Sequence, residues 1–276
     1  MGLKLAVLAA ALVAATPISS GAGFLQARQL PDGSFAERGR PGYPQLTAWA
    51  TLGLTAAGSG PRARGLTIKY LVAQEAALTS PTDIALAALA EQALGQPADG
   101  LLARLRGLQR ADGSVGGLVN GTAWSVLAFR GSGSAVQPRT VRWLLSRQTR
   151  AGGWGWSPRG GADSNDTAAV VEALRSANVT GKPISRALGF LLRFRNRDGG
   201  FELTHGRGSD AQSTAWAVQA FAAARKPAPR GALPYLRRLQ RSDGSFRYSM
   251  RYATTPVWVT AQVLPALARK AFPLGR

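Results

Sequence analysis

The segment QLPDGSF, residues 29–35, is the first copy of a phrase that returns along the chain, and QRSDGSF, residues 240–246, is the last. Varied copies between them are QRADGSV (109–115), QTRAGGW (148–154) and RNRDGGF (195–201). An alanine-rich stretch follows each copy, so a larger unit repeats and not the phrase alone. Such self-similarity is typical of proteins that arrange one supersecondary unit in a stack or around a closed body.

A second phrase, T-A-W or a variant of it, opens the alanine-rich stretches and gives the period. Its copies begin at Thr47, Thr82, Thr122, Thr167, Thr214 and Pro256. The copies at Thr82 and Pro256 match least well. Successive openers lie about 35 to 47 residues apart, which is the length of a two-helix hairpin with a variable loop.

The two halves of each unit differ in polarity. Segments before the phrase are arginine-rich and amphipathic, whereas a stretch such as 214–224 contains no charge, as expected of a buried helix. The pattern predicts inner helices near 47–57, 82–94, 122–129, 167–176, 214–224 and 256–268. It predicts outer helices near 24–28, 62–74, 98–109, 136–148, 183–194 and 230–241. We therefore expect an all-α fold, an α6/α6 toroid with an inner and an outer ring of helices.

The first residues have the pattern of a secretory signal peptide. Lys4 precedes an apolar run over residues 5–15, and Ser20-Gly21-Ala22 offers small residues for cleavage. We expect a signal peptide over residues 1–22, a single toroid domain over residues 23–276, and a secreted or extracytoplasmic location in the periplasm or cell envelope. The chain has no cysteine, which excludes disulfides, thiol nucleophiles and thiolate metal ligands.

The chain is strongly basic, with a formal net charge of +20 carried mostly by arginine. The basic residues are spread over all repeats and do not cluster on one helix, so we expect no nucleic-acid partner. Two interpretations stay open: a general preference for arginine codons, or attraction to an anionic membrane surface.

The repeated phrase resembles the "QW" repeat of squalene–hopene cyclases and other terpene cyclases. The resemblance covers roughly residues 24–273 and implies the terpenoid cyclase-like toroid, which protein prenyltransferases and cobalamin carriers of the transcobalamin type share. The prenyltransferases hold zinc with aspartate, cysteine and histidine. This chain has no cysteine and one histidine, His205, so we expect neither a metal nor a cofactor.

The segment Asp163-Ser164-Asn165-Asp166-Thr167-Ala168 resembles the D-x-D-D-T-A motif of class II terpene cyclases. In that family the middle aspartate protonates an alkene or epoxide, and its neighbours keep it acidic. Asp163 matches the first aspartate and Asp166 the last, but Asn165 occupies the donor position, and an amide is no Brønsted acid. The other interpretation is that Asp163 and Asp166 only cap the helix that follows.

Neutral hydrogen-bonding residues recur two positions before each opener. They are Gln45, Ser80, Asn120, Asn165, Gln212 and Thr254. In a six-fold toroid they would form a ring at the N-terminal ends of the inner helices, where they either cap those helices or recognise a ligand. Trp154 and Trp156, in a glycine-rich loop, are further candidates for contact with a ligand.

These features favour a non-catalytic binding module. An apolar ligand with neutral polar edges, either a corrinoid or an isoprenoid, would lie in the pocket, and a partner subunit would close it. The alternative is a terpene cyclase or another isoprenoid-modifying enzyme that uses Asp163 and Asp166. The predicted ligand-binding residues are Gln45, Asn120, Asn165, Asp166, Gln212, Thr254, Trp154 and Trp156.

Overall fold

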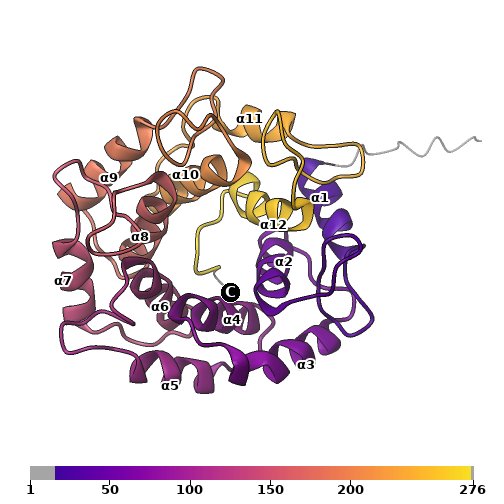
Figure 1. The fold of residues 1–276 in the computed structure, drawn as a ribbon, viewed down its shortest axis with the longest axis horizontal. Helices are drawn as coiled ribbons and strands as arrows, with labels where there is room; N and C mark the ends of the chain where they lie inside the picture. The colour runs from indigo at the N-terminus through magenta and orange to yellow at the C-terminus, as the bar shows by residue number, and fades with distance from the viewer. Residues whose placement is uncertain (1–15, 275–276) are drawn as a thin grey trace, which may run out of the picture.

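The computed structural model describes residues 16–274, and its helices form two concentric rings (Figure 1). The inner ring consists of α2 (Pro44–Ala56), α4 (Pro81–Ala93), α6 (Val119–Gly131), α8 (Ser164–Ser176), α10 (Ala211–Ala223) and α12 (Pro256–Leu267). The outer ring consists of α1 (Pro17–Gln26), α3 (Arg64–Gln74), α5 (Asp99–Gly107), α7 (Pro138–Ser146), α9 (Lys182–Leu192) and α11 (Ala232–Arg238), with a 3-10 turn at Glu75–Ala77. The described residues contain isolated bridges but no longer strand, so the predicted all-α, α6/α6 toroid is confirmed.

The rings close between the first and last repeats. Helix α12 packs against α2, where Gly53 allows close approach: a Cβ there would lie 2.6 Å from the Ala261 carbonyl oxygen. The carboxylate of Glu37, from the loop before α2, accepts the N–H groups of Val257 and Trp258 at the start of α12, both at 3.0 Å. The molecule is therefore a closed toroid and not an open solenoid.

An opener threonine fixes five of the six inner helices, all but α4, against the repeated phrase. Its hydroxyl accepts the N–H of the last residue of the phrase at 2.9 to 3.0 Å. The pairs are Thr47–Phe35, Thr122–Val115, Thr167–Trp154, Thr214–Phe201 and Thr260–Phe246. Thr260 and not Pro256 is therefore the sixth opener, and the predicted register of the last repeat was wrong by four residues.

The Asp-Gly turn of the phrase lies directly on the next outer helix. Gly113 has a φ of 96°, and a Cβ there would lie 2.6 Å from the backbone oxygen of Arg139. Asp112 accepts the N–H of Ser114 at 2.9 Å, which holds the turn. The turn thus requires glycine for both its backbone conformation and its close contact.

The first outer helix begins earlier than the sequence predicted. Helix α1 starts at Pro17, with Thr16 as its N-cap, and not near residue 24. The Gln240 side chain donates to the Pro17 carbonyl at 2.8 Å, and a Cβ on Gly21 would meet Leu264 of α12 at 2.9 Å. Residues 16–22 are thus built into the toroid, while the rest of the predicted signal peptide, residues 1–15, lies outside the described residues. In the described part of the chain, no helix combines the length and apolarity needed to cross a bilayer.

Candidate functional site

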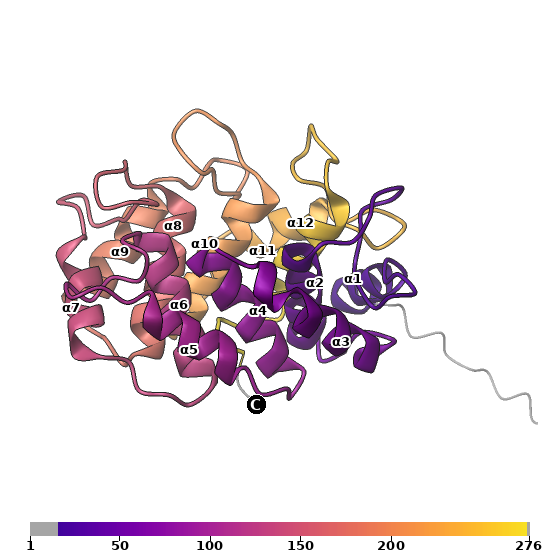
Figure 2. The same cartoon turned by 60° about the horizontal axis from the view of Figure 1, so that its bottom comes forward.

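A cavity of about 550 Å³ opens at the N-terminal ends of the inner helices, the end from which the long loops rise in Figure 2. Its outer layer takes one side chain from each inner helix, two residues before the opener. These side chains are Gln45, Thr82, Asn120, Asn165, Gln212 and Trp258. Gln45, Asn120, Asn165 and Gln212 thus lie where the sequence predicted them.

Two members of the predicted ring lie elsewhere. Ser80 is the N-cap of α4, and its hydroxyl accepts the Asp83 N–H at 3.2 Å. Thr254 is exposed on the loop before α12 and does not line the cavity. The cause is the register error in repeats two and six, where Ile84 and Thr260 occupy the opener position.

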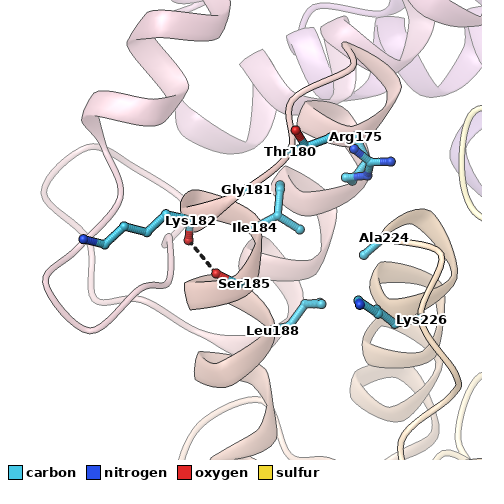
Figure 3. Close-up of a pocket in the computed structure, with 9 residues that line it drawn as sticks. All are labelled: Arg175, Thr180, Gly181, Lys182, Ile184, Ser185, Leu188, Ala224 and Lys226. Atoms are coloured by element: carbon cyan, nitrogen blue, oxygen red, sulfur yellow. Dashed lines mark hydrogen bonds between the residues drawn. The ribbon is translucent and has the colours of Figure 1, made fainter.

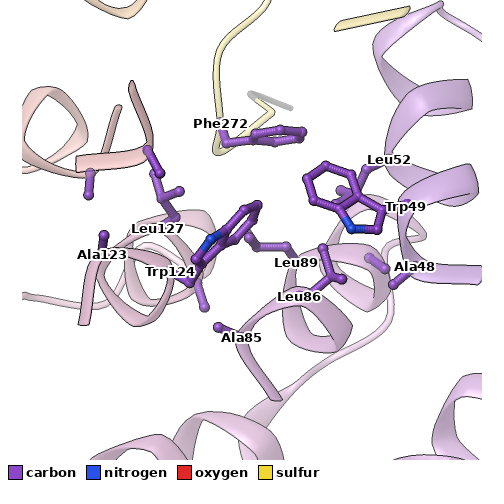
Figure 4. Close-up of a cluster of buried hydrophobic side chains, with 14 of the residues drawn as sticks. Ala48, Trp49, Leu52, Ala85, Leu86, Leu89, Ala123, Trp124, Leu127 and Phe272 are labelled. Atoms are coloured by element: carbon purple, nitrogen blue, oxygen red, sulfur yellow. The ribbon is translucent and has the colours of Figure 1, made fainter. Parts of the chain in front are cut away.

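The deeper layer alternates large and small side chains, two residues after each opener. Its members are Trp49, Leu86, Trp124, Ala169, Trp216 and Gln262. The three indoles meet edge to face, with ring centroids 5.4, 5.7 and 5.8 Å apart and interplanar angles of 87° to 90°. We call Trp49, Trp124 and Trp216 the indole triad; it forms the apolar floor of the cavity, and Figure 4 shows two of its members.

The polar layer is not a set of helix caps. The N-cap residues of α2, α6, α8 and α10 are Tyr43, Leu118, Asp163 and Asp210, each two residues before the ring position. Asp163 does cap α8, because its carboxylate accepts the Asp166 N–H at 2.8 Å. The capping interpretation is thus right for Asp163 and Ser80 and wrong for the four amides, whose side chains face the cavity.

A hydrogen-bonded chain crosses three inner helices at the rim. The Thr82 hydroxyl donates to the Asn120 side-chain carbonyl at 2.8 Å, and the Asn120 amide donates to Asp166 at 2.7 Å. Asp166 is 7% exposed and lies in the first turn of α8, where the free N–H groups of the helix stabilise negative charge.

The two carboxyl groups at this rim have unequal acidity. Burial and, to a smaller extent, the charge of Asp163 raise the pKa of Asp166, the Asn120 hydrogen bond opposes both effects, and the resulting pKa is about 7. Burial also raises the pKa of Asp163, while the Asp166 N–H that it accepts lowers it. Near neutral pH the pair can therefore carry a proton on Asp166 while Asp163 keeps the charge that caps the helix.

The two loop tryptophans have different positions. Trp156 is 52% exposed and lines the central cavity. Trp154 is fully buried, its indole N–H donates to the Leu144 carbonyl at 2.7 Å, and it packs between the two rings. Trp154 therefore contributes to the core and does not reach a ligand in this cavity.

The sequence did not lead us to predict Thr82, Leu86, Ala169, Leu203 and Gln262 as lining residues. Alignment of repeats two and six on Ile84 and Thr260 as openers would have placed Thr82 and Gln262 in the two layers. His205 lies outside the cavity lining, stacked on Phe194 with ring centroids 4.4 Å apart. Among residues 16–274, no three side chains of the metal-binding types gather in one place.

A second cavity, of about 580 Å³, lies between α9 and the end of α10 (Figure 3). Ile184, Leu188 and Ala224 form an apolar wall, with Lys182 and Lys226 at its edge. The one hydrogen bond drawn there joins Ser185 to a carbonyl of its own helix, at 3.1 Å. No cluster of polar groups converges on this cavity, so the central cavity is the better candidate site.

Comparison with known proteins identifies one curated relative and a shared fold. No family model matches the sequence. A curated relative, drimenyl diphosphate synthase from Streptomyces showdoensis, is 35% identical over 133 residues, which cover 45% of this chain and 25% of the relative. The match thus spans only a quarter of that enzyme's length.

Solved structures match nearly the whole chain. A protein from Actinoplanes superposes with a TM-score of 0.69 at 21% identity, covering 92% of this chain and 98% of that one. The type II terpene cyclase MstE from Scytonema superposes with a TM-score of 0.68 at 15% identity, covering 91% and 96%. The chain therefore has the fold of the type II terpene cyclases, the terpenoid cyclase-like α/α toroid.

Proposed function

We propose that the chain is an isoprenoid-modifying enzyme, in which the central cavity holds a prenyl chain and Asp166 protonates it. The observation that carries the proposal is the position of Asp166, a buried acid with a pKa of about 7 at the rim of an apolar cavity. This is the enzyme alternative of the sequence analysis, and we favour it over the non-catalytic one because every group that the reaction needs lies around one cavity.

The proposed step is a proton transfer to a carbon–carbon double bond. The π electrons form a new C–H bond with the Asp166 proton, which leaves a tertiary carbocation on the substrate and a carboxylate on Asp166. The Asn120 amide, 2.7 Å from Asp166, stabilises that carboxylate. A second double bond can then attack the cation and close a ring, and loss of a proton ends the reaction without any change of oxidation state.

The indole triad suits the cation that this step creates. Indole faces attract positive charge through their quadrupole, by about 0.5–2 kcal/mol for each well-placed ring. Trp49, Trp124 and Trp216 lie in the layer beneath the rim, and Trp258 adds an indole beside it. The same side chains exclude water, which would otherwise trap the cation as an alcohol.

The donor in this proposal is displaced by one residue from the family pattern. Asn165, at the family's donor position, lines the cavity but can only offer hydrogen bonds. Asp166, the last acid of the motif, instead receives the Asn120 hydrogen bond. The substitution at Asn165 is the one observation that favours the non-catalytic alternative, an isoprenoid-binding protein.

The substrate class follows from the two layers of the cavity. The relative's name specifies a drimenyl diphosphate, and MstE has been solved with geranylgeranyl dihydroxybenzoate as substrate; both are isoprenoids with a polar head. Such a molecule would place its hydrocarbon on the indole triad and its head among the amides of Gln45, Asn165 and Gln212. A corrinoid would gain less from this floor. Export, an anionic membrane surface and a partner subunit over the mouth stay predictions.

The test is incubation of the purified protein with farnesyl and geranylgeranyl diphosphate and with the corresponding alcohols. Gas chromatography with mass spectrometry, after removal of any phosphate, separates cyclic isomers from the linear starting material. We expect cyclic product from the wild type, none from Asp166→Asn, and product from Asp83→Asn, a matched change of another acid that lines the cavity.

The same samples distinguish the alternatives. Quenching of tryptophan fluorescence by the prenyl compounds, without conversion, would identify a non-catalytic isoprenoid-binding protein. If the prenyl compounds are not converted and do not quench the fluorescence, both forms of the proposal are refuted.

A further inference from the structure

Residues 268–274 turn back from the end of α12 and run inside the inner ring (Figure 1). Arg269 makes the turn with a left-handed φ of 52°, and the Lys270 N–H closes it by donating to the Pro265 carbonyl at 2.9 Å. Pro273 lies beside Gly131, the last residue of α6. The segment therefore occupies the end of the lumen opposite the cavity mouth.

Phe272 is the side chain that this segment inserts. It is 2% exposed, and its ring centroid lies 6.0 Å from those of Trp49 and Trp124 and 6.3 Å from that of Trp216 (Figure 4). It does not line the central cavity. Phe272 thus packs against the face of the indole triad that points away from the cavity.

Glu172 holds the segment through its backbone. Its carboxyl group is fully buried and accepts the Phe272 N–H at 2.6 Å. The equivalent positions in α2, α4 and α6, five residues after the opener, are Leu52, Leu89 and Leu127, and those in α10 and α12 are Gln219 and Pro265. Glu172 is thus the one acid at this level of the six inner helices. A buried polar group is costly unless it is hydrogen-bonded, and Glu172 gains such a bond from the backbone N–H of Phe272.

We propose that residues 268–274 close the lumen beneath the indole triad, and that Phe272 sets the depth to which an apolar molecule can enter. The three indoles contact one another only edge to face. They therefore close the lumen only while the space beneath them is filled. Without the phenyl ring, an indole can rotate downward and the cavity can extend toward Glu172. The depth limit rests on the proposed isoprenoid binding, whereas closure of the lumen does not.

The first experiment measures closure without any ligand. Acrylamide quenching of tryptophan fluorescence is compared among the wild type, Phe272→Ala and a matched control, Phe190→Ala. Phe190 is also a buried phenylalanine, at 6% exposure, but it lies on the outer helix α9. We expect the quenching constant to rise by about 1.5-fold in Phe272→Ala alone, because the triad becomes accessible from below. Equal quenching constants in Phe272→Ala and Phe190→Ala would overturn the proposed closure of the lumen by residues 268–274.

A second pair of variants tests the segment without changing Phe272. Glu172→Leu gives α8 the residue of α2, α4 and α6 but removes the acceptor of the Phe272 N–H, whereas Glu172→Gln keeps an acceptor. We expect the quenching constant to rise in Glu172→Leu and to stay at the wild-type value in Glu172→Gln. If the quenching constant rises in neither variant, Glu172 does not hold the segment, and its part in closing the lumen is contradicted.

The last experiment measures depth. Affinities for farnesol, geranylgeraniol and a longer polyprenol are determined by titration with the wild type, Phe272→Ala and Phe190→Ala. We expect the preference for the longest alcohol over farnesol to rise about tenfold in Phe272→Ala only, which corresponds to about 1.4 kcal/mol. An unchanged preference would overturn Phe272 as the depth limit. If no prenyl alcohol binds the wild type, the proposed function fails together with the depth limit, while the acrylamide result still decides closure.

Discussion

A carboxylic acid that protonates a double bond must carry its proton at the working pH and must leave a stable anion behind. Burial and the charge of Asp163 meet the first condition, because they raise the pKa of Asp166 to about 7. The Asn120 amide meets the second, because it bonds the carboxylate directly. Since the two effects oppose each other, a pKa near neutrality is what their balance produces.

The proposed reaction therefore has a defined pH dependence. We expect kcat/KM to be constant at acidic pH and to fall tenfold per pH unit above about 7, as Asp166 loses its proton. In Asp163→Asn the neighbouring charge is absent, so the pKa of Asp166 should drop and the fall should begin at lower pH. Steady-state rates between pH 5 and 9 check both statements, and a rate that rises with pH would contradict a proton donor at this position.

At the scale of the helix, closure of the ring is concentrated at the N-terminus of α12. The N-termini of α6, α8 and α10 donate to backbone carbonyls of the following repeat, at Trp156, Leu203 and Tyr248. At the N-terminus of α12, the side chain of Glu37 from the first repeat takes the place of that carbonyl.

We expect Glu37→Ala to lower the free energy of unfolding by about 1–3 kcal/mol, because two partly buried helix N–H groups lose a charged acceptor. Glu37→Gln should lose less, since its amide oxygen can still accept one of the N–H groups. Urea unfolding followed by circular dichroism measures both. Equal stability of Glu37→Ala and the wild type would show that packing of α12 on α2 closes the ring unaided.

The element scale also shows what the sequence could predict. The period of the repeats and the uncharged inner stretches predicted both rings, and the four amides of the cavity followed from their distance to the opener. Repeats two and six were misaligned because Thr82 and Pro256 resemble openers locally. The opener of repeat six is identified by a hydrogen bond from the phrase to the Thr260 hydroxyl. This contact joins residues 14 positions apart, and no helix pattern contains it.

Other parts of the site depend on contacts between repeats. Asp163 and Asp166 were identified from the motif, but the link from Thr82 through Asn120 to Asp166 joins residues 38 and 46 positions apart. Trp154 and Trp156 look equivalent in a glycine-rich loop, and only the closed rings decide that Trp154 points into the core. The C-terminal segment inside the lumen had no counterpart in the repeat pattern.

The stability of the whole toroid depends on the residue at which the mature chain begins. A chain that begins at Thr16 keeps all of α1, whereas one that begins at residue 23 loses the Gln240–Pro17 hydrogen bond and the packing of Gly21 on Leu264. We expect the shorter chain to be less stable by about 2 kcal/mol or more. Thermal unfolding of the two purified chains tests this, and equal melting temperatures would make cleavage after Ala22 compatible with an intact toroid.

Buried carboxyl groups should make the whole toroid more stable in mild acid. Burial raises the pKa of Glu91 and of Glu172 to about 8, well above their values in an unfolded chain. Between about pH 4.5 and 8 the folded state then binds more protons than the unfolded state, so stability falls as the pH rises. We expect the melting temperature to decrease over this range, and less steeply in Glu172→Gln. A melting temperature that increased with pH would contradict neutral buried acids.

The bond between Glu37 and α12 joins residues 220 positions apart, and this separation bears on how the chain folds. Each hairpin can form from residues that are close in the sequence. The contact between the first repeat and α12 requires the two ends of the nearly complete ring to meet, so it is the slowest contact to form. Until then, the apolar flanks of α2 and α12 are uncovered. A second chain offers the same pair of flanks, so concentrated refolding favours rings shared between two molecules, each completing the other through an exchanged hairpin.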